Sequence, residues 1–390
     1  MKPLNKCINK NAKIEITMSE KSKKKMCRPI ALFIPSLNGG GAQKVVVNLA
    51  NALVDLTEHP IHVVLVKKEG VFLSDLREEV AVIDLHSSRT LFSIFALRRY
   101  LLNVRPISIM SSMNYVNIVC SAASVLAGKP SKLILREANV FNRTSGWNIK
   151  SVLSFSKSRL MRMFYSFSDT VILNSNSTLE TLEKNTILGK KSRTKVIYNP
   201  IAIDQNTKIH EQFERRRYIC AIGRLVKQKG FDVLIEAFSQ ITDKDIELVI
   251  LGEGPLESDL KKISNDLGLV DRVHFPGFVT PVASVLKNAQ AFVLSSRWEG
   301  FGNVIVEALA LGVPVVATDC PGGPREILED GQHGILVKPE SVDDLVRGIN
   351  TVLFSPVGDF ESRLKRSQNF MPNEIAKRYL EVMLCNSGDC

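Results

Sequence analysis

The sequence lacks the cysteine and histidine spacings that mark zinc sites and disulfide-stapled domains. Its seven cysteines are dispersed through 390 residues, and none belongs to a CxxC pair. An odd, dispersed set inside apolar runs is typical of reduced thiols, so we expect neither disulfides nor a metal held by cysteine. Long apolar runs are also missing, since Val116–Gly128 is among the longest and a bilayer span needs about 20 residues.

The start of the chain, residues 1–28, is rich in lysine but has no apolar core, so it does not resemble a secretory signal. We expect a cytoplasmic protein with a basic, disordered tail whose functional start is Met1 or Met18. No internal repeat of short period occurs. No recognised nucleic-acid-binding motif occurs either, so we expect no nucleic acid as a partner.

Charge is distributed unevenly between the two halves of the chain. Residues 1–200 carry 30 Lys and Arg against 13 Asp and Glu, whereas residues 201–390 carry 21 against 27. A basic half favours an anionic partner such as phospholipid, a lipid diphosphate or nucleic acid. A solvated basic face with a disordered tail explains the same excess, because charge alone names no partner.

Short apolar runs typical of buried parallel strands alternate with helical patterns along both halves. The runs are PIALFIPSL, IHVVLV, SIMSSM, KLILREAN, DTVILNS and KVIYNP, then RYICAIG, IELVILG, RVHFPGF, AQAFVLSS, VPVVATD and HGILVKP. Helices are expected between the first runs at 91–104, 115–127, 148–167 and 176–185. This alternation predicts an α/β protein with two Rossmann-like, doubly wound domains that face a cleft.

The predicted domain boundaries follow from changes in composition. Residues 1–28 form the tail, 29–200 the N-terminal domain, 201–217 a polar linker and 218–372 the C-terminal domain. A last helix in 373–390 is expected to pack back on the N-terminal domain. Ligands of such sheets bind at the carboxyl ends of the strands, so the loops after the predicted strands hold the candidate site residues.

Two of these loops in the second half carry features suited to a diphosphate. In IGRLVKQKG, a turn at Gly223 is flanked by Arg224 and Lys229, and free backbone N–H groups beside two cations can bind phosphate oxygens. Both side chains are equally compatible with ordinary surface cations. In ILGEGP, Gly252 and Gly254 allow a ligand to approach the backbone closely or simply form a tight turn.

The stretch EGFGNVIVEALALG contains the strongest signal. Gly300 and Gly302 allow a sharp turn that exposes amides at a helix N-terminus, and Asn303 is a plausible cap. Glu307 interrupts an apolar helical face, and a buried carboxylate needs hydrogen-bond donors. The two adjacent hydroxyls of a ribose supply them, so we predict that Glu307 binds a nucleotide ribose while Glu299 meets the other end of the ligand. The following CPGGPREIL turn either adds further amides or is a plain structural turn.

The first half contributes two further loops. Gly39, Gly40 and Gly41 end the first strand in SLNGGGAQK, where bare backbone can approach phosphate or sugar, although the spacing is not that of a dinucleotide site. The second loop begins in LREAN and carries a polar cluster expected to point at the cleft. Its members are Arg136, Glu137, Asn139 and Arg143.

Taken together, GGGAQKVVVNLA, VIYNPI, GRLVKQKGFDVLIEAF, LGEGP, FPGF and EGFGNVIVEALALGVPVVATDCPGGPREIL resemble the family 4 retaining glycosyltransferases of the GT-B fold. The resemblance covers residues 30–385 and is looser between 85 and 165. It implies transfer of a sugar from a nucleotide sugar, a uridine nucleotide in our interpretation, with retention and with neither metal nor other cofactor. The CPGGPREIL version of the last loop resembles bacterial enzymes that extend polyprenyl-diphosphate-linked glycans for surface polysaccharides, including lipopolysaccharide.

The resemblance assigns roles that are carried over residue by residue. It places the acceptor in the N-terminal domain and the donor in the C-terminal domain. Arg224 and Lys229 hold the diphosphate, with Gly223, Gly252 and Gly254 in the loops beside it, and Glu307 holds the ribose. Glu299 holds the donor sugar together with the amides of Phe301, Gly302 and Asn303, next to Gly300. Gly40 and Gly41 close over the donor. Many relatives carry a histidine where this chain has Arg136 and Glu137, so the acceptor-side residue is left open.

The stretch WNIKSVLSFSKSRLMRMFYSFSD, residues 147–169, mixes basic and aromatic side chains. It is compatible with lying on an anionic membrane, where a lipid-linked acceptor is found, and equally with a core helix that has a basic face. The rival functions are a nucleotide-sugar 2-epimerase, a non-catalytic donor-binding or membrane scaffold subunit, and nucleic-acid binding through the basic half. The phosphate-loop and paired-glutamate motifs favour the transferase over these.

Overall fold

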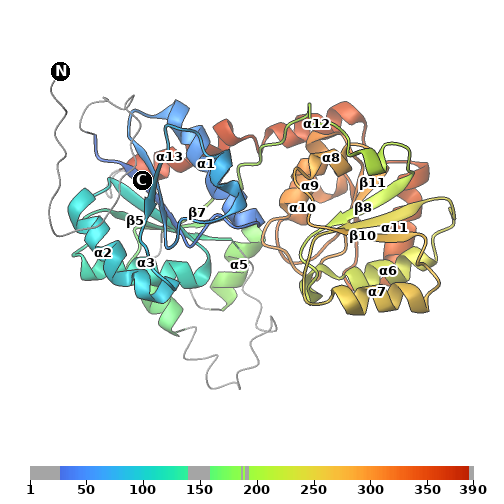
Figure 1. The fold of residues 1–390 in the computed structure, drawn as a ribbon, viewed down its shortest axis with the longest axis horizontal. Helices are drawn as coiled ribbons and strands as arrows, with labels where there is room; N and C mark the ends of the chain where they lie inside the picture. Colours follow the sequence, from blue (N-terminus) through green and yellow to red (C-terminus); the bar gives the residue numbers. More distant parts are fainter. Residues whose placement is uncertain (1–26, 139–158, 186–187, 189–192, 386–390) are drawn as a thin grey trace.

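The structure is a computed structural model that describes residues 27–138, 159–185, 188 and 193–385, and these form two α/β parts side by side (Figure 1). Each part is built on one sheet, and every strand pairing within the described residues is parallel. The strand orders are β3-β2-β1-β4-β5-β6-β7 and β10-β9-β8-β11-β12-β13. Both contain the reversal of a doubly wound sheet. The predicted fold class, two Rossmann-like parallel-sheet domains, is confirmed.

The first part contains seven strands. They are β1 (Ile30–Ile34), β2 (Ile61–Leu65), β3 (Ala81–Asp84), β4 (Ser108–Ser112), β5 (Lys132–Glu137), β6 (Thr170–Leu173) and β7 (Thr194–Val196). Its helices are α1 (Gly41–Leu56), α2 (Ser93–Val104), α3 (Asn114–Leu126) and α5 (Asn176–Lys184), with 3-10 turns η1 (Val71–Asp75) and η2 (Thr90–Phe92). Strands β1, β2 and β4 are buried along their whole length, which is why they consist almost entirely of apolar and small residues.

The second part contains six strands. They are β8 (Tyr218–Ile222), β9 (Glu247–Leu251), β10 (Val273–Gly277), β11 (Ala291–Leu294), β12 (Val315–Thr318) and β13 (Ile335–Val337). Its helices are α6 (Phe231–Ser239), α7 (Glu257–Asp266), α8 (Ala283–Leu286), α9 (Asn303–Ala310), α10 (Pro324–Ile327), α11 (Val342–Phe354) and α12 (Phe360–Gln368). The 3-10 turns are η3 (Glu211–Phe213), η4 (Lys227–Lys229) and η5 (Glu329–Gly331). All six apolar runs expected in this half are strands.

Strand β3 is the one that the sequence pattern did not predict. It has four residues, lies at the edge of its sheet, and only Ile83 in it is fully buried. A short edge strand therefore lacks the continuous apolar run on which the other strands were recognised. Most of the helix predicted at 148–167 lies outside the described residues; the part from 159 to 165 is helical.

The last helix, α13 (Pro372–Leu384), returns from the second part and lies along α1 of the first (Figure 1). Ile375 and Tyr379 are buried in the same apolar cluster as the strands β1 and β2. Because the chain crosses between the parts twice, at residues 197–217 and again before α13, it ties the two parts together.

The cysteines differ in one respect from the expectation of free thiols throughout. Cys27, Cys120, Cys220 and Cys320 are free, but Cys385 is disulfide-bonded. The general expectation came from cysteines inside apolar runs, whereas Cys385 follows the end of α13 and is only partly buried. No helix among the described residues has the length and apolar character required to cross a membrane.

Candidate functional site

The N-termini of two helices from different parts meet. Helix α1 begins at Gly41, after β1, and helix α9 begins at Asn303, after β11. The Asn303 side-chain amide donates to the Gly41 carbonyl oxygen at 3.3 Å. Neither helix has a side-chain cap or an acidic residue in its first turn. Two uncapped helix N-termini place partial positive charge on both sides of one spot, which suits an anion.

Asn303 does not cap α9, which corrects the expectation from the sequence. The N-cap is Gly302, whose φ of 101° is in the left-handed region that glycine tolerates. Asn303 is the first helical residue, and its side-chain oxygen accepts a hydrogen bond from the side-chain amide of Asn199 at 2.7 Å. Asn303 therefore joins the two parts of the molecule instead of satisfying its own helix.

Lys229 and Glu299, 70 positions apart in the chain, form an ion pair. The Lys229 ammonium lies 2.5 Å from Glu299 Oε1, and the Ser296 hydroxyl donates to the same oxygen at 2.5 Å. Glu299 is only 6% exposed, so both donors are needed to stabilise its charge. Arg224 is exposed, and within the described residues its side chain has no hydrogen-bond or ion-pair partner. Its guanidinium is therefore available to a ligand.

The glycines beside Arg224 and Lys229 are required by close approach of the backbone. A Cβ on Gly252, whose φ is +132°, would lie 2.1 Å from the carbonyl oxygen of Gly223. A Cβ on Gly254 would lie 2.5 Å from the Leu225 carbonyl oxygen, and one on Gly223 would lie 2.8 Å from the Lys229 side chain. The two loops that follow β8 and β9 are therefore stacked directly on each other. Side chains of any size there would push them apart.

Glu307 lies in α9, one turn after the helix start, and is partly buried. Burial raises the pKa of its carboxyl group to about 7, and the charge of Lys44 in α1 acts in the opposite direction. Among the described residues, no donor forms a hydrogen bond with this carboxylate. A desolvated carboxylate without donors is costly, so it is suited to a ligand that brings hydroxyl groups.

Lys44 was not recognised in the sequence. It lies in the first turn of α1, where its ammonium is 2.6 Å from Asp75 and 5.1 Å from the centre of the Phe72 ring. Its position three residues after Gly41 was the available signal. Only the meeting of α1 with α9 brings it near Glu307.

The loop that contains Gly322 and Gly323 packs against the backbone of Glu299 and Phe301. A Cβ on Gly322 would lie 2.2 Å from the Glu299 carbonyl oxygen, and one on Gly323 would lie 2.4 Å from that of Phe301. The Phe301 ring is buried against Tyr198 and Phe370, with ring centres 5.5 and 5.7 Å away. The turn in CPGGPREIL thus packs against the backbone of the segment from Glu299 to Phe301, in which Gly300 is also buried.

The predicted acceptor-side residues lie in the interior of the first part. Arg136 is fully buried and donates to Tyr379, Ser112 and Asn199 at 3.0, 2.7 and 2.5 Å. Glu137 is also fully buried and accepts a hydrogen bond from Tyr165 at 2.5 Å. Neither side chain is open to the space between the parts, which corrects the expectation of a cluster pointing there.

Those interactions occupy both side chains, and an acceptor-side role for them stays a prediction. Asn139 and Arg143 lie outside the described residues.

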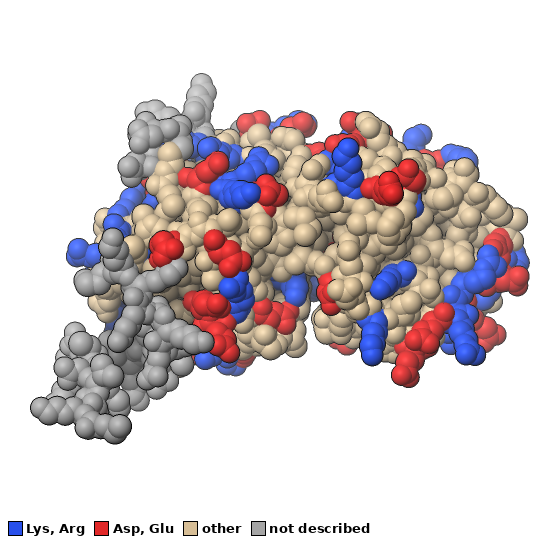
Figure 2. All heavy atoms as spheres, turned by 90° about the horizontal axis from the view of Figure 1, so that it is seen from above, with Lys and Arg blue, Asp and Glu red and all other residues tan. Residues whose placement is uncertain are grey.

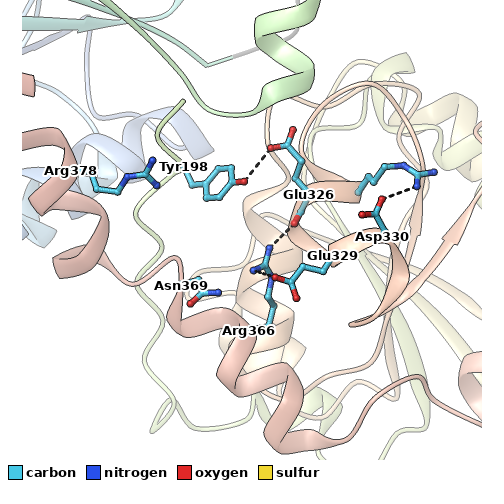
Figure 3. Close-up of a pocket in the computed structure, with 8 residues that line it drawn as sticks. Tyr198, Glu326, Glu329, Asp330, Arg366, Asn369 and Arg378 are labelled. Carbon is cyan, nitrogen blue, oxygen red and sulfur yellow. Dashed lines mark hydrogen bonds and ion pairs between the residues drawn. The ribbon is translucent and has the colours of Figure 1, made fainter. Parts of the chain in front are cut away.

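A hollow near the junction of the two parts is separate from these residues. It has a volume of about 490 Å³, and Figure 3 shows the charged side chains around it. Its lining residues are Tyr198, Arg325, Glu326, Glu329, Asp330, Arg366, Asn369 and Arg378. Glu326 accepts hydrogen bonds from Asn176 and Ser177 of the first part and from Tyr198 of the segment that connects the parts. The hollow therefore lies beside a polar contact between the parts. No group of three His, Cys, Asp or Glu side chains in the described chain is placed to hold a metal ion.

Two family models match the chain in succession. Residues 39–205 match "Glycosyltransferase Family 4", and residues 202–370 match "Glycosyl transferases group 1". Campylobacter jejuni has two similar enzymes that are N-acetylgalactosaminyltransferases acting on undecaprenol-diphosphate-linked glycans. One is 26% identical over 83% of this chain and 90% of its own length, and the other is 27% identical over 91% and 98%.

A further relative, an uncharacterised glycosyltransferase of Methanocaldococcus jannaschii, is 33% identical over 48% of this chain. The match spans about half of that relative, 52% of its length.

Solved structures show the same fold. The Anabaena protein HepE in complex with UDP has a TM-score of 0.73 at 23% identity, over 91% of this chain and 99% of that one. WaaG, a glycosyltransferase involved in lipopolysaccharide biosynthesis, has a TM-score of 0.66 at 16% identity, over 92% and 100%. The two consecutive family matches run together from residue 39 to residue 370, and the chain is therefore a glycosyltransferase with a family 4 domain followed by a group 1 domain.

Proposed function

We propose that the protein is a retaining, metal-independent hexosyltransferase. It moves a sugar from a UDP-linked donor onto a polyprenyl-diphosphate-linked glycan that is an intermediate of surface polysaccharide or lipopolysaccharide. The lipid-linked acceptors of the two Campylobacter jejuni relatives support the acceptor, and the UDP bound to the Anabaena protein supports the nucleotide. An acceptor of this kind is membrane-bound, so we place the enzyme at the cytoplasmic face of the membrane.

The observation that carries the proposal is the Glu307 carboxylate. It is desolvated and without a donor among the described residues, one helical turn from the place where the N-termini of α1 and α9 meet. A ribose supplies two adjacent hydroxyl donors to a carboxylate, and a diphosphate suits helix N-termini. A nucleoside diphosphate carries a ribose, which can bind Glu307, next to a diphosphate, which can bind the helix N-termini.

The residues proposed to bind the nucleotide sugar have separate roles in the reaction. As the bond between the sugar and the diphosphate breaks, negative charge develops on the diphosphate. Arg224, Lys229 and the amides of Gly40 and Gly41 stabilise that charge where it forms. Glu299 and the amides of Phe301, Gly302 and Asn303 hold the sugar. Since a diphosphate leaves without a general acid, the departing phosphate takes the proton of the attacking acceptor hydroxyl on the same face, and the configuration is retained.

The test is a measurement of nucleoside diphosphate release from a panel of nucleotide sugars, with EDTA present and with a polyprenyl-diphosphate sugar as acceptor. Release from one donor is expected, and the lipid acceptor should increase it. Glu307→Ala should abolish it, whereas Glu236→Ala, which removes an exposed carboxylate on α6, should not. Loss of release with EDTA would contradict metal independence. Nucleotide binding without release from any donor would favour a non-catalytic donor-binding subunit.

A further inference from the structure

One face of the first part carries large apolar side chains that are mostly exposed. Leu91, Phe92 and Phe95 are 64%, 62% and 75% exposed. They lie in η2 and the first turn of α2. Phe95 follows Leu91 by four positions and Phe92 by three, and these are the spacings at which side chains are neighbours on a helix surface. Three adjacent exposed side chains of this size are unusual for a surface in water and mark an interaction site.

The charged residues that flank this apolar cluster in the sequence, from position 85 to position 105, are all arginines. Arg89 precedes it, and Arg98 and Arg99 follow it one turn later on the exposed side of α2. Arg98 donates to the carbonyl oxygen of Leu126 at 2.9 Å. Within the described residues none of the three arginines forms an ion pair with a carboxylate. Their charge is thus available to a partner.

The absence of acidic residues extends far beyond the helix. Between Asp84 and Asp169 the only acidic residue is Glu137, which is fully buried and accepts a hydrogen bond from Tyr165. The same stretch holds 12 Lys and Arg. Elsewhere the two signs mix: on the face in Figure 2 the described acidic and basic side chains alternate over both parts. The region around η2 and α2 is therefore selectively basic.

We propose that Leu91, Phe92 and Phe95 insert into an anionic lipid membrane while Arg89, Arg98 and Arg99 contact its headgroups. An aromatic and aliphatic cluster flanked by arginines, in a stretch without acidic residues from 85 to 136, has the chemistry of an interfacial anchor. An interface with a protein partner usually uses charges of both signs to fix how the two surfaces align. The 52 residues from 85 to 136 contain no acidic residue that could contribute to such an interface.

The position of this surface suits the proposed lipid-linked acceptor, on which this inference partly rests. Turn η2 follows the carboxyl end of β3, and the glycine loop follows the carboxyl end of β1 in the same sheet. In the strand order, β2 alone separates β3 from β1. The anchor and the glycine loop therefore lie at the same edge of the sheet, and a docked enzyme holds its site near the membrane surface.

Vesicle co-sedimentation tests the proposal with the full chain. Wild-type protein should bind vesicles of phosphatidylcholine with phosphatidylglycerol, bind vesicles of phosphatidylcholine alone weakly, and lose binding as salt rises. Phe92→Ser with Phe95→Ser should reduce binding at least about tenfold. Arg98→Gln and Arg99→Gln should each reduce it by about fivefold. The matched control is Phe354→Ser, which removes a phenylalanine that is 73% exposed in the second part.

The proposal is overturned if the double phenylalanine variant binds like wild type, or if Phe354→Ser weakens binding equally. Equal binding to neutral vesicles also contradicts it. Self-association that Phe92→Ser abolishes, without vesicle binding, would assign the face to a second copy. Nucleoside diphosphate release with a detergent-dispersed acceptor separates the two proposals. Nucleoside diphosphate release without vesicle binding would contradict only the proposed membrane surface. Vesicle binding without nucleoside diphosphate release would contradict only the proposed transferase mechanism.

Discussion

The Lys229 side chain is expected to interact with two groups. It forms an ion pair with Glu299 in the free protein, and we expect it to bind the diphosphate during turnover. We predict that Lys229→Ala lowers kcat by about 100-fold to 1000-fold, since the loss of one donor to a developing oxyanion costs about 2–4 kcal/mol. Steady-state kinetics with the accepted donor measures this. Lys227→Ala, which removes an exposed lysine of the same 3-10 turn, is the control and should retain activity. Equal losses in both variants would show that the effect comes from general charge.

Glu307 gives a second prediction at this scale, on stability. In the folded protein burial raises the pKa of its carboxyl group from the ordinary value of 4.5 to about 7. The folded state therefore holds a proton that the unfolded chain has released, and stability falls as pH rises between these two values. Glu307→Gln removes this loss. In the absence of a nucleotide sugar, the free energy of unfolding of the variant should therefore exceed that of wild type by on the order of 2 kcal/mol at pH 8, and by less at pH 5.

Urea denaturation of the two proteins at both pH values measures the difference. The same gain at pH 5 and pH 8 would mean that ionisation of Glu307 is not its cause. Activity should be lost in this variant at both pH values, because glutamine lacks the carboxylate that is proposed to bind the ribose. A gain in stability together with a loss of activity is expected where a binding group is destabilising to the free protein.

At the scale of elements, the loops after β8 and β9 depend on glycine at their point of contact. Gly252→Ala combines a left-handed φ of +132° with a Cβ only 2.1 Å from the Gly223 carbonyl oxygen. We predict that it displaces the turn before Arg224 and raises KM for the donor by about tenfold, with a loss of stability of about 1–3 kcal/mol. The control is Gly268→Ala, where φ is +69° and a Cβ meets nothing within 4 Å. Gly268→Ala should lose about 1 kcal/mol by strain alone, with an unchanged KM. A KM that rises equally in both variants would contradict the argument.

The elements also show why sequence patterns succeed where they do. Buried strands such as β9 and β12 are continuous apolar runs, so they were predictable. Strand β3 was not, because a short edge strand is buried only in part. Glu307 was predictable because a carboxylate interrupts an apolar helical face. Lys44 was not, because its relation to Glu307 depends on two helices that are distant in the chain.

For the whole molecule, the arrangement of the two parts is the feature that local patterns could not specify. The buried Arg136 illustrates this, since its partners Asn199 and Tyr379 lie 63 and 243 positions away. From the sequence it is an arginine at a strand end and looks like a ligand-binding residue. In the structure it holds the start of the segment between the two parts to α13.

Glu326 provides a test of how the two parts are held together. It belongs to the second part, and its carboxylate accepts hydrogen bonds from Asn176 and Ser177, at 2.9 and 3.1 Å, at the N-terminus of α5 in the first part (Figure 3 shows Glu326). The Ser177 hydroxyl accepts in turn from the N–H of Gly322, which lies behind Glu299. A carboxylate at a helix N-terminus is stabilising, so this contact favours the arrangement of the two parts seen in the structure, here called closed, and it fixes the Gly322 loop against the backbone of Glu299.

We predict that Glu326→Ala opens the molecule, with a larger radius of gyration by small-angle X-ray scattering in the absence of donor and a KM for the donor raised by about tenfold. The change follows from loss of the closed population, which the donor must then restore at the cost of affinity. Asp330→Ala is the matched control, because Asp330 lines the same hollow but pairs with Arg325 of its own part. An unchanged radius in Glu326→Ala, or the same increase in Asp330→Ala, would mean that the closed arrangement rests on the Asn199–Asn303–Gly41 contacts instead.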